Sequence, residues 1–301
     1  MLDALGLPRS IFSDPVEPGT PLAPLRDAIA RLTSADKLTH PIQVIASASH
    51  DTASAVAAVP AVGDDHVWIS CGTWSILGIE SASPHLDDKA RDCGLSNELG
   101  VNGTTRLLRN VSGLWMIQEC QRQWELDGTK MNYGEMADLA TSANPFTAFV
   151  NPDVPEFAQP GGMPDRIREF CAKTGQQEPT DKATILRIAT ESIALAYALV
   201  IDRIQTATGK TFRRIHIVGG GTRNELLMQA TADATGLDVI AGPVEATACG
   251  NVMMQLIATG EVDSMDAARD IIRKSFPLTT YHPSNQSEWK EPLQRFKELI
   301  G

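Results

Sequence analysis

The chain has 301 residues, a length that suggests two domains, and 43% of them are hydrophobic and 21% charged, which is ordinary for a globular protein. A formal net charge of -11 with no cluster of Lys and Arg argues against a nucleic-acid partner, because phosphate binding needs clustered positive side chains. The five cysteines form no C-x-x-C pair, and we find neither a basic, apolar leader nor about eighteen consecutive apolar residues, so we expect a cytoplasmic protein without a zinc site or membrane span.

The N-terminal part reads as a linker that leads into a compact unit. Residues 1–40 are rich in Pro and Gly and include a short helical pattern at 25–32. A strand is predicted over 42–46 and an Ala-rich, buried helix over 52–59. Asp51 stands between them, where a carboxylate can project into a cleft and accept a proton from a substrate hydroxyl. The alternative is that Asp51 only caps the helix.

The next segments predict a hairpin and a long core helix. Apolar runs at 66–70 and 75–80 flank Gly72-Thr73, whose N–H groups and hydroxyl suit a terminal phosphate, although a plain turn is the simpler interpretation. A helix is predicted over 112–124, followed by irregular, Pro-rich surface at 145–164. Apolar residues three and four apart predict one long helix over 183–208 that ends at Gly209.

The glycines of 219–221 are the most informative feature of the sequence. They follow an apolar strand at 215–218 and precede an amphipathic helix that we expect Gly236 to end. Such a turn allows close approach of an adenosine or phosphate to the backbone, although a tight strand-to-helix turn is an alternative. The spacing is not G-x-G-x-x-G, so a Rossmann dehydrogenase is not indicated. A strand at 237–241 and helices at 245–259 and 264–275 follow, and strands alternating with helices predict an α/β class.

In this order the motifs resemble those of the FGGY carbohydrate kinases, and within that family those of the rhamnulokinases. The resemblance is carried by Ala48-Ser-His-Asp-Thr-Ala-Ser-Ala55, Ile69-Ser-Cys-Gly-Thr-Trp-Ser75, Leu95-Ser-Asn-Glu98, Arg109-Asn-Val-Ser-Gly-Leu-Trp115, His216-Ile-Val-Gly-Gly-Gly221 and Gly242-Pro-Val-Glu-Ala-Thr-Ala-Cys-Gly-Asn251. It implies an actin-like ATPase (ribonuclease-H-like) fold with a mixed sheet flanked by helices. Residues 1–40 would then be a hinge with a remnant of a preceding domain, 41–285 the nucleotide-binding C-terminal domain, and 286–301 a C-terminal helix.

The resemblance also implies roles for individual residues. Asp51 would be the general base that receives the proton of the sugar hydroxyl, and His50, Thr52 and Asn110 would contact the ketose. The implied nucleotide contacts are Gly72, Thr73, Gln118, Gly220, Gly221 and Asn224, and no residue of the chain is implied as a metal ligand. The implied reaction transfers the γ-phosphate of ATP to O1 of L-rhamnulose, with Mg²⁺ neutralising the developing charge.

The chain departs from the family pattern in one large respect. Family members carry a first domain that supplies a D-x-G-[ST] phosphate loop and the Mg²⁺-coordinating carboxylates, and we find neither here. We therefore expect this chain alone to be a weak ATP binder with little kinase activity, because the cleft lacks its opposite wall. The alternatives are a kinase for another ketose or polyol and a non-catalytic ATP- or sugar-binding module. The sequence does not specify an oligomeric state.

Overall fold

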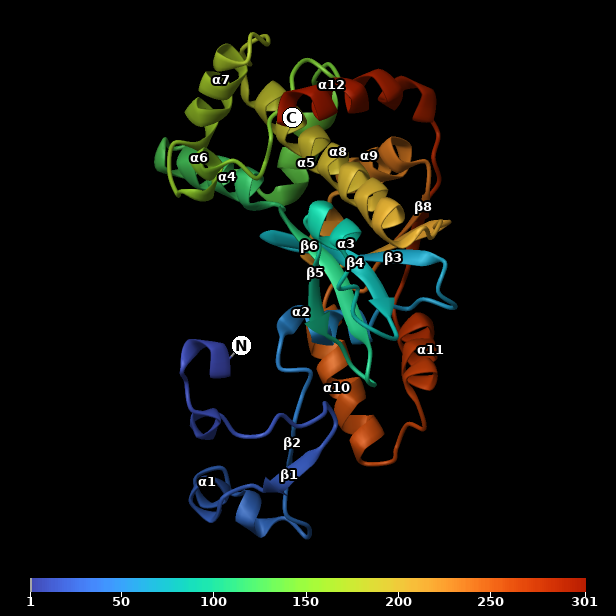
Figure 1. The fold of residues 1–301 in the computed structure, drawn as a ribbon. Helices are drawn as coiled ribbons and strands as arrows, with labels where there is room; N and C mark the ends of the chain where they lie inside the picture. The colour runs from blue at the N-terminus through green and yellow to red at the C-terminus, as the bar shows by residue number, and fades with distance from the viewer. Residues whose placement is uncertain (1) are drawn as a thin grey trace.

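A seven-stranded mixed sheet lies at the centre of the computed structural model, which describes residues 2–301 (Figure 1). Its order is β5-β6-β4-β3-β7-β8-β9, in which β3, β7 and β8 run parallel and the other neighbours are antiparallel. The strands are β3 (His66–Cys71), β4 (Trp74–Ser81), β5 (Ser96–Leu99), β6 (Thr105–Ser112), β7 (Arg214–Val218), β8 (Asp238–Ala241) and β9 (Thr279–Tyr281). The predicted α/β class with a mixed sheet is confirmed.

Helices cover both faces of this sheet. The larger core lies on the side of α8 and α9, and a smaller apolar cluster lies under α2, α10 and α11 on the other side (Figure 1). The helices are α2 (Asp51–Ala57), α3 (Asp88–Asp92), α4 (Trp115–Leu126), α5 (Tyr133–Ser142), α6 (Pro155–Ala158), α7 (Met163–Lys173), α8 (Lys182–Thr208), α9 (Glu225–Thr235), α10 (Ala246–Ala258), α11 (Met265–Ser275) and α12 (Lys290–Ile300). Helices α2 and α9, which begin beside candidate residues from the sequence, therefore lie on opposite faces of the sheet.

The long helix α8 forms the spine of the larger core, as its sequence pattern predicts. Asp181 caps its first turn by accepting from the Thr184 amide, and Gly209 ends it in the left-handed conformation. Contrary to expectation, α8 is long and apolar enough to cross a membrane. Its most apolar window is 83% buried inside the protein, so its apolarity is accounted for by core packing.

Two sequence predictions for the middle of the chain are wrong. The helix predicted over 112–124 begins only at Trp115, because Ser112 still belongs to β6, a strand that the sequence pattern did not reveal. The region 145–164 is not irregular surface, since Ala148, Phe149 and Val150 are buried in the larger core. It also holds α6 and the start of α7, in whose first turn Pro164 lies.

The N-terminal segment forms a small unit apart from the main sheet. The predicted strand is present as β2 (Gln43–Ile45), but it pairs with β1 (Pro21–Pro24) in a separate two-stranded sheet. The short helix α1 (Asp27–Leu32) lies between these two strands in the sequence. The predicted domain boundary at residue 40 stays a prediction. Residue 1 of the predicted hinge lies outside the described residues. At the other end, α12 is part of the main body, because Phe296 is buried in the larger core.

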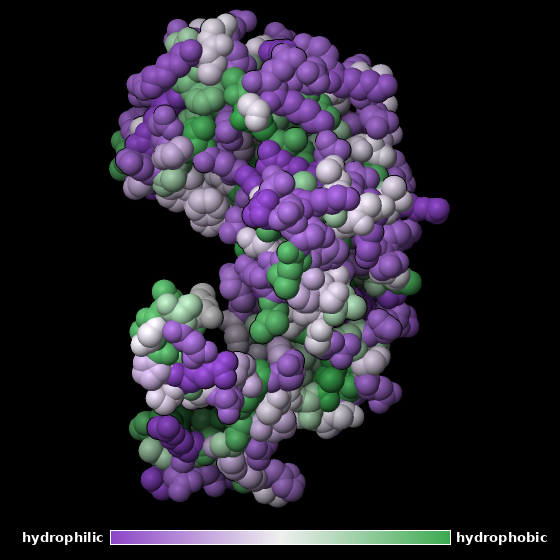
Figure 2. Space-filling view, in the orientation of Figure 1, coloured by the Kyte–Doolittle hydropathy of each residue, from purple (hydrophilic) through white to green (hydrophobic). Residues whose placement is uncertain are grey.

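Apolar side chains are exposed on this N-terminal segment. Leu5, Leu7, Ile11, Phe12 and Val16 are all solvent-exposed. Figure 2 shows apolar residues on its surface and a hollow between it and the main body. A surface of this kind is typical of a region that contacts another polypeptide.

Two buried histidines, His66 on β3 and His216 on β7, lie against each other on the side of the smaller cluster. Their ring centroids are 5.4 Å apart, and the residues are only 7% and 3% exposed. Burial, with a further contribution from Arg269, lowers the pKa of His66 to about 4. Burial, with a further contribution from His66, lowers the pKa of His216 to about 3. Both rings are therefore neutral in the folded protein at neutral pH.

We expect this pair to make the free energy of unfolding fall as the pH drops below 6.5, the ordinary pKa of histidine. Below that pH the unfolded chain binds protons on both rings and the folded chain does not, so stability is complete above 6.5 and is lost between 6.5 and the folded pKa values. The loss at pH 5 is about 2 kcal/mol for each ring. Urea denaturation at pH 7.5 and pH 5 measures it.

The matched variants for this measurement are the double substitution His66→Phe with His216→Phe and the single substitution His40→Gln in the exposed linker. The double variant should flatten the dependence on pH, whereas His40→Gln should leave it as in the wild type. An unchanged slope in the double variant would assign the pH dependence to other groups.

Candidate active site

The tip of the β3–β4 hairpin is held in place by the start of α4. The amides of Leu114 and Trp115 donate to the carbonyl oxygens of Gly72 and Thr73, each at 3.0 Å. Gly113 lies so close beneath the tip that a Cβ there would stand 2.8 Å from the Gly72 oxygen. The turn is therefore fixed from below, while the Thr73 side chain is exposed above it.

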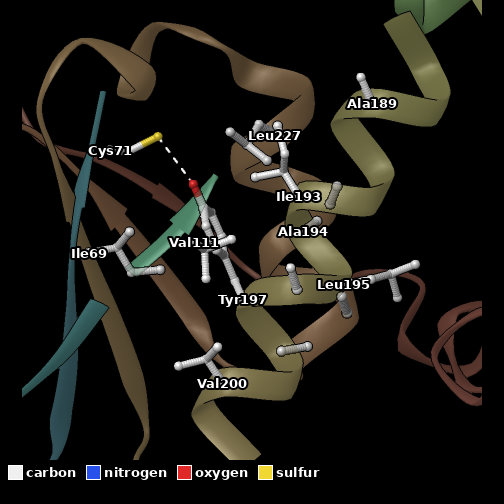
Figure 3. Packing of buried hydrophobic residues seen from close by; sticks show 14 of the residues in the cluster. Ile69, Cys71, Val111, Ala189, Ile193, Ala194, Leu195, Tyr197, Val200 and Leu227 are labelled. Atoms are coloured by element: carbon white, nitrogen blue, oxygen red, sulfur yellow. Dashed lines mark hydrogen bonds between the residues drawn. The ribbon is translucent and has the colours of Figure 1, made fainter. Parts of the chain in front are cut away.

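A hydroxyl on the long helix anchors the same hairpin directly beside its tip. The Tyr197 hydroxyl lies 2.5 Å from Oγ of Ser75 and 3.4 Å from Sγ of Cys71, and these residues flank the tip. Figure 3 shows the contact with Cys71. Burial raises the pKa of both Tyr197 and Cys71, so the hydroxyl and the thiol stay protonated at neutral pH. The hairpin is thus bonded to the long helix that forms the spine of the larger core.

The three glycines that follow β7 are suited to their positions for different structural reasons. Gly219 has φ of 95°, and its Cβ would lie 2.7 Å from the Cys71 carbonyl oxygen. A Cβ on Gly221 would collide with Sγ of Cys71, whereas one on Gly220 would meet nothing within 4 Å. Gly219 and Gly221 therefore allow β7 and β3 to approach each other, and Gly220 leaves backbone open to a ligand.

Gly220 and Gly221 form the first half of a short 3-10 turn, Gly220–Arg223, which precedes α9. The sequence pattern predicted that the helix follows the glycines directly. Asn224 then caps α9, because its Oδ1 accepts from the Leu227 amide at 3.0 Å. Gly236 ends α9 in the left-handed conformation, as expected.

Asp51 is the first residue of α2, and the capping position belongs to His50. Nδ1 of His50 and Oδ1 of Asp51 both accept from the Thr52 amide, at 3.2 and 2.7 Å. The Asp51 side chain is 79% exposed. The carboxylate therefore touches the helix N-terminus through one oxygen and presents the other to solvent, so the alternative that Asp51 is the N-cap is wrong.

Two adjoining pockets bring together all ten residues that the sequence singled out. The glycine pocket has a volume of about 300 Å³ and lies between the hairpin tip, the glycine turn and helices α4, α5 and α8. Its lining includes Gly72, Thr73, Gln118, Gly220, Gly221 and Asn224. The Asp51 pocket has a volume of about 610 Å³, and its lining includes His50, Asp51, Thr52 and Asn110.

The two pockets share Gly72, Thr73 and Gly220. A ligand in the glycine pocket can therefore reach the Asp51 pocket across the hairpin tip and Gly220, whose Cβ position is open. The arrangement suits transfer of a group between a molecule in one pocket and a molecule in the other.

The sequence did not identify several residues of the two linings. Tyr133, Met136, Leu186 and Thr190 complete the glycine pocket from α5 and α8. Trp74, Ile76, Val244 and Thr247 line the Asp51 pocket, and the Thr247 hydroxyl donates to the Asp51 carbonyl oxygen at 3.3 Å. Trp74, Val244 and Thr247 lie within motifs quoted above but were given no role there, and the other residues lie in no motif. The available signal was Trp74, a large aromatic residue directly beside the polar hairpin tip.

Comparisons with known proteins agree with this geometry. Residues 67–259 match the model of the FGGY family of carbohydrate kinases, C-terminal domain. The chain is 39% identical to a rhamnulokinase of Bacteroides thetaiotaomicron and 37% identical to one of Bacillus subtilis, in each case over 100% of this chain and 60% of the relative. The chain thus spans about three fifths of the length of these curated relatives.

Solved structures of kinases share the fold at low sequence identity. A ligand-bound xylulose kinase from Lactobacillus acidophilus has a TM-score of 0.75 and 14% identity, with coverage of 99% of this chain and 59% of that one. A glycerol kinase from Plasmodium falciparum with ADP has a TM-score of 0.63 and 17% identity, with coverage of 88% and 52%. These structures support the actin-like architecture expected from the sequence.

Proposed function

Because the chain belongs to the FGGY family of carbohydrate kinases, we propose that it is the part of an ATP-dependent sugar kinase that holds the nucleotide and the general base, with L-rhamnulose as the sugar. The observation behind this proposal is the meeting of the two pockets at Gly72, Thr73 and Gly220. The choice of L-rhamnulose rests on relatives named rhamnulokinase that are 36–39% identical to this chain.

The glycine pocket suits an adenosine group. Apolar side chains of Leu114, Ile117, Met136 and Leu186 form much of its wall, while the glycine turn leaves backbone accessible at Gly220. An apolar slot with a few polar groups is the usual form of such a site. The phosphates would extend from it toward Gly72 and Thr73, which border both pockets.

In the proposed reaction, Asp51 accepts the proton of the sugar O1 hydroxyl as that oxygen attacks the γ-phosphorus of ATP. The new O–P bond forms as the bond to the β,γ-bridging oxygen breaks, and ADP leaves. The exposed oxygen of Asp51 is open to the substrate side of the pocket, while its other oxygen is held by the Thr52 amide. His50, Thr52 and Asn110 would orient the sugar, and Thr73 the phosphate.

The magnesium ion of this reaction would be part of the nucleotide substrate. Within residues 2–301, no group of three or more His, Cys, Asp or Glu side chains is placed to hold a metal ion. Among the described residues that line the Asp51 pocket, Asp51 is the only acidic one. A lining with so few carboxylates fits Mg²⁺ that is bound to the phosphates of ATP, where the ion would neutralise charge on the transferred group.

A sugar panel tests the substrate. The chain, joined to the first domain of a rhamnulokinase, is incubated with ATP and L-rhamnulose, L-fuculose or D-xylulose, and ADP formation is followed. We expect the highest kcat/KM with L-rhamnulose. A higher kcat/KM with another ketose would assign that ketose as the substrate in place of L-rhamnulose. ATP binding without any phosphoryl transfer would favour the non-catalytic module.

Gly220→Val tests the nucleotide part in the chain itself. The added side chain enters open space between the two pockets, so we expect about tenfold weaker ATP binding, or about 1.4 kcal/mol, with an unchanged melting temperature. Gly221→Ala is the matched variant, because its methyl group collides with Cys71 and should lower stability by about 1–3 kcal/mol. Calorimetric titration and thermal melting separate the two effects. Full ATP affinity in Gly220→Val would place the phosphates elsewhere.

A further inference from the structure

We propose that Trp74 determines specificity for the sugar by packing its indole against the apolar, deoxygenated end of a 6-deoxyketose. The inference rests on the proposed function and assigns the residue that distinguishes L-rhamnulose from its C6-hydroxylated counterpart, L-fructose. Trp74 is 55% exposed and lines the Asp51 pocket.

The sheet register places this indole beside the proposed sugar contacts. On β4 and β6, Trp74 is paired with Ser112, and Ile76 with Asn110. Because alternate residues of a strand share a face, Trp74 and Ile76 lie on the same face of the sheet as Asn110. That face is the one from which α2 presents Asp51. Trp74 and Asn110 are therefore diagonal neighbours across the floor of the pocket.

The wall of the Asp51 pocket thus has two chemical characters. His50, Asp51 and Asn110 supply polar groups that suit hydroxyls, whereas Trp74, Ile76 and Val244 supply apolar surface. A sugar with hydroxyls along one part and a methyl group at its end matches this division. A sugar with a hydroxyl at C6 would place a polar group against the apolar wall and lose hydration there.

Within residues 2–301, the indole of Trp74 has neither of the environments that hold the other tryptophans, which are a buried position or a hydrogen bond of the indole N–H. Of the five tryptophans, all within residues 2–301, Trp68, Trp124 and Trp289 are buried. Trp115 is partly buried, and its indole N–H donates to the Phe157 carbonyl oxygen at 2.8 Å. Within the described part of the chain the Trp74 side chain makes no hydrogen bond. Its backbone takes part in the turn, because the Gly72 amide donates to the Trp74 carbonyl oxygen at 2.9 Å. Its exposed surface is available to a ligand.

Intrinsic fluorescence provides a direct test on the 301-residue chain. L-rhamnulose should shift the emission to shorter wavelength, because binding removes water from the exposed indole, and Trp74→Phe should abolish the shift while calorimetry still detects binding. We expect wild type to prefer L-rhamnulose over L-fructose by about ten- to a hundredfold. Trp74→Ala should reduce that preference to about twofold or less.

Leu86→Ala is the matched control, because Leu86 is also a large, exposed apolar side chain but lines neither pocket. It should leave the sugar preference and the fluorescence shift unchanged.

Three results would overturn the role of Trp74: binding of L-rhamnulose without a change in emission, an unaltered preference in Trp74→Ala, or ATP binding to a chain that binds neither sugar at millimolar concentrations. The kinase proposal itself fails on a different result, namely no phosphorylation of any ketose by the chain joined to a first domain.

Discussion

Replacing Asp51 by Asn is expected to lower kcat for phosphoryl transfer by about 10²–10⁴-fold, the usual contribution of a general base. Asparagine keeps the size of the side chain and an oxygen that can accept from the Thr52 amide, so α2 should fold as before. It cannot accept the proton of an attacking hydroxyl. ATP affinity should change little, because Asp51 lines the Asp51 pocket and not the glycine pocket.

This experiment uses the chain joined to the first domain of a rhamnulokinase, with ADP release and ATP titration measured on the same preparations. Asp263→Asn is the control, because Asp263 is an exposed carboxylate on the α10–α11 loop outside both pockets. Its kcat should equal that of the wild type. If Asp51→Asn retained wild-type turnover, proton transfer would have to be assigned to another group.

The second large effect is expected from Gly250→Ala, which should lower both stability and turnover. Gly250 on α10 packs against α2, where an added Cβ would collide with the Ser54 carbonyl oxygen and stand 3.3 Å from the Ala57 methyl group. Neither group can rotate away, since one is helix backbone and the other a methyl on the same buried helix. Overpacking of this kind costs about 1–3 kcal/mol, and α2 must move with Asp51 on its first turn.

Thermal melting should therefore show a fall of about 2–4 °C for each kcal/mol lost. In the joined protein kcat should fall while the dissociation constant for ATP stays the same, because the glycine pocket contains no residue of α2 or α10. Ala248→Ser tests the same helix at an exposed position and should change neither quantity. A wild-type melting temperature in Gly250→Ala would show that the two helices separate without cost.

The features that the sequence predicted correctly are those written in local patterns. The hairpin, the helix α8 and the strand before the glycine turn each follow from the spacing of apolar residues or from glycine chemistry within one segment. The sequence analysis did not predict the strands β5 and β6, because Glu98, Arg106 and Arg109 interrupt the alternation of apolar and polar residues that is typical of a strand. In the structure the Arg106 guanidinium is buried and bonded to Glu98 across the strand pair, which becomes evident only after pairing.

Eight of the ten candidate residues lie in the quoted motifs, and Gln118 and Asn224 lie three residues beyond the ends of two of them. The structure places all ten on two adjoining pockets. The rest of the lining could not be predicted from sequence, because Tyr133 and Leu186 reach the glycine pocket from helices that carry no motif. Equally, no local sequence pattern indicated that β2 would pair with β1 and not with the main sheet. Such choices depend on the competition between distant partners.

The parallel register between β3 and β7 has a consequence for the order of folding. It pairs Val67 with Ile215, so nearly half of the chain must be ordered or looped out before these two strands can join. Pairings between such distant segments are slow to form. Gly72 follows one of the strands and Gly220 follows the other, so a chain that has not made this pairing has neither pocket. Nucleotide would then bind to the completed fold alone, and by mass action it would draw newly made chains toward it.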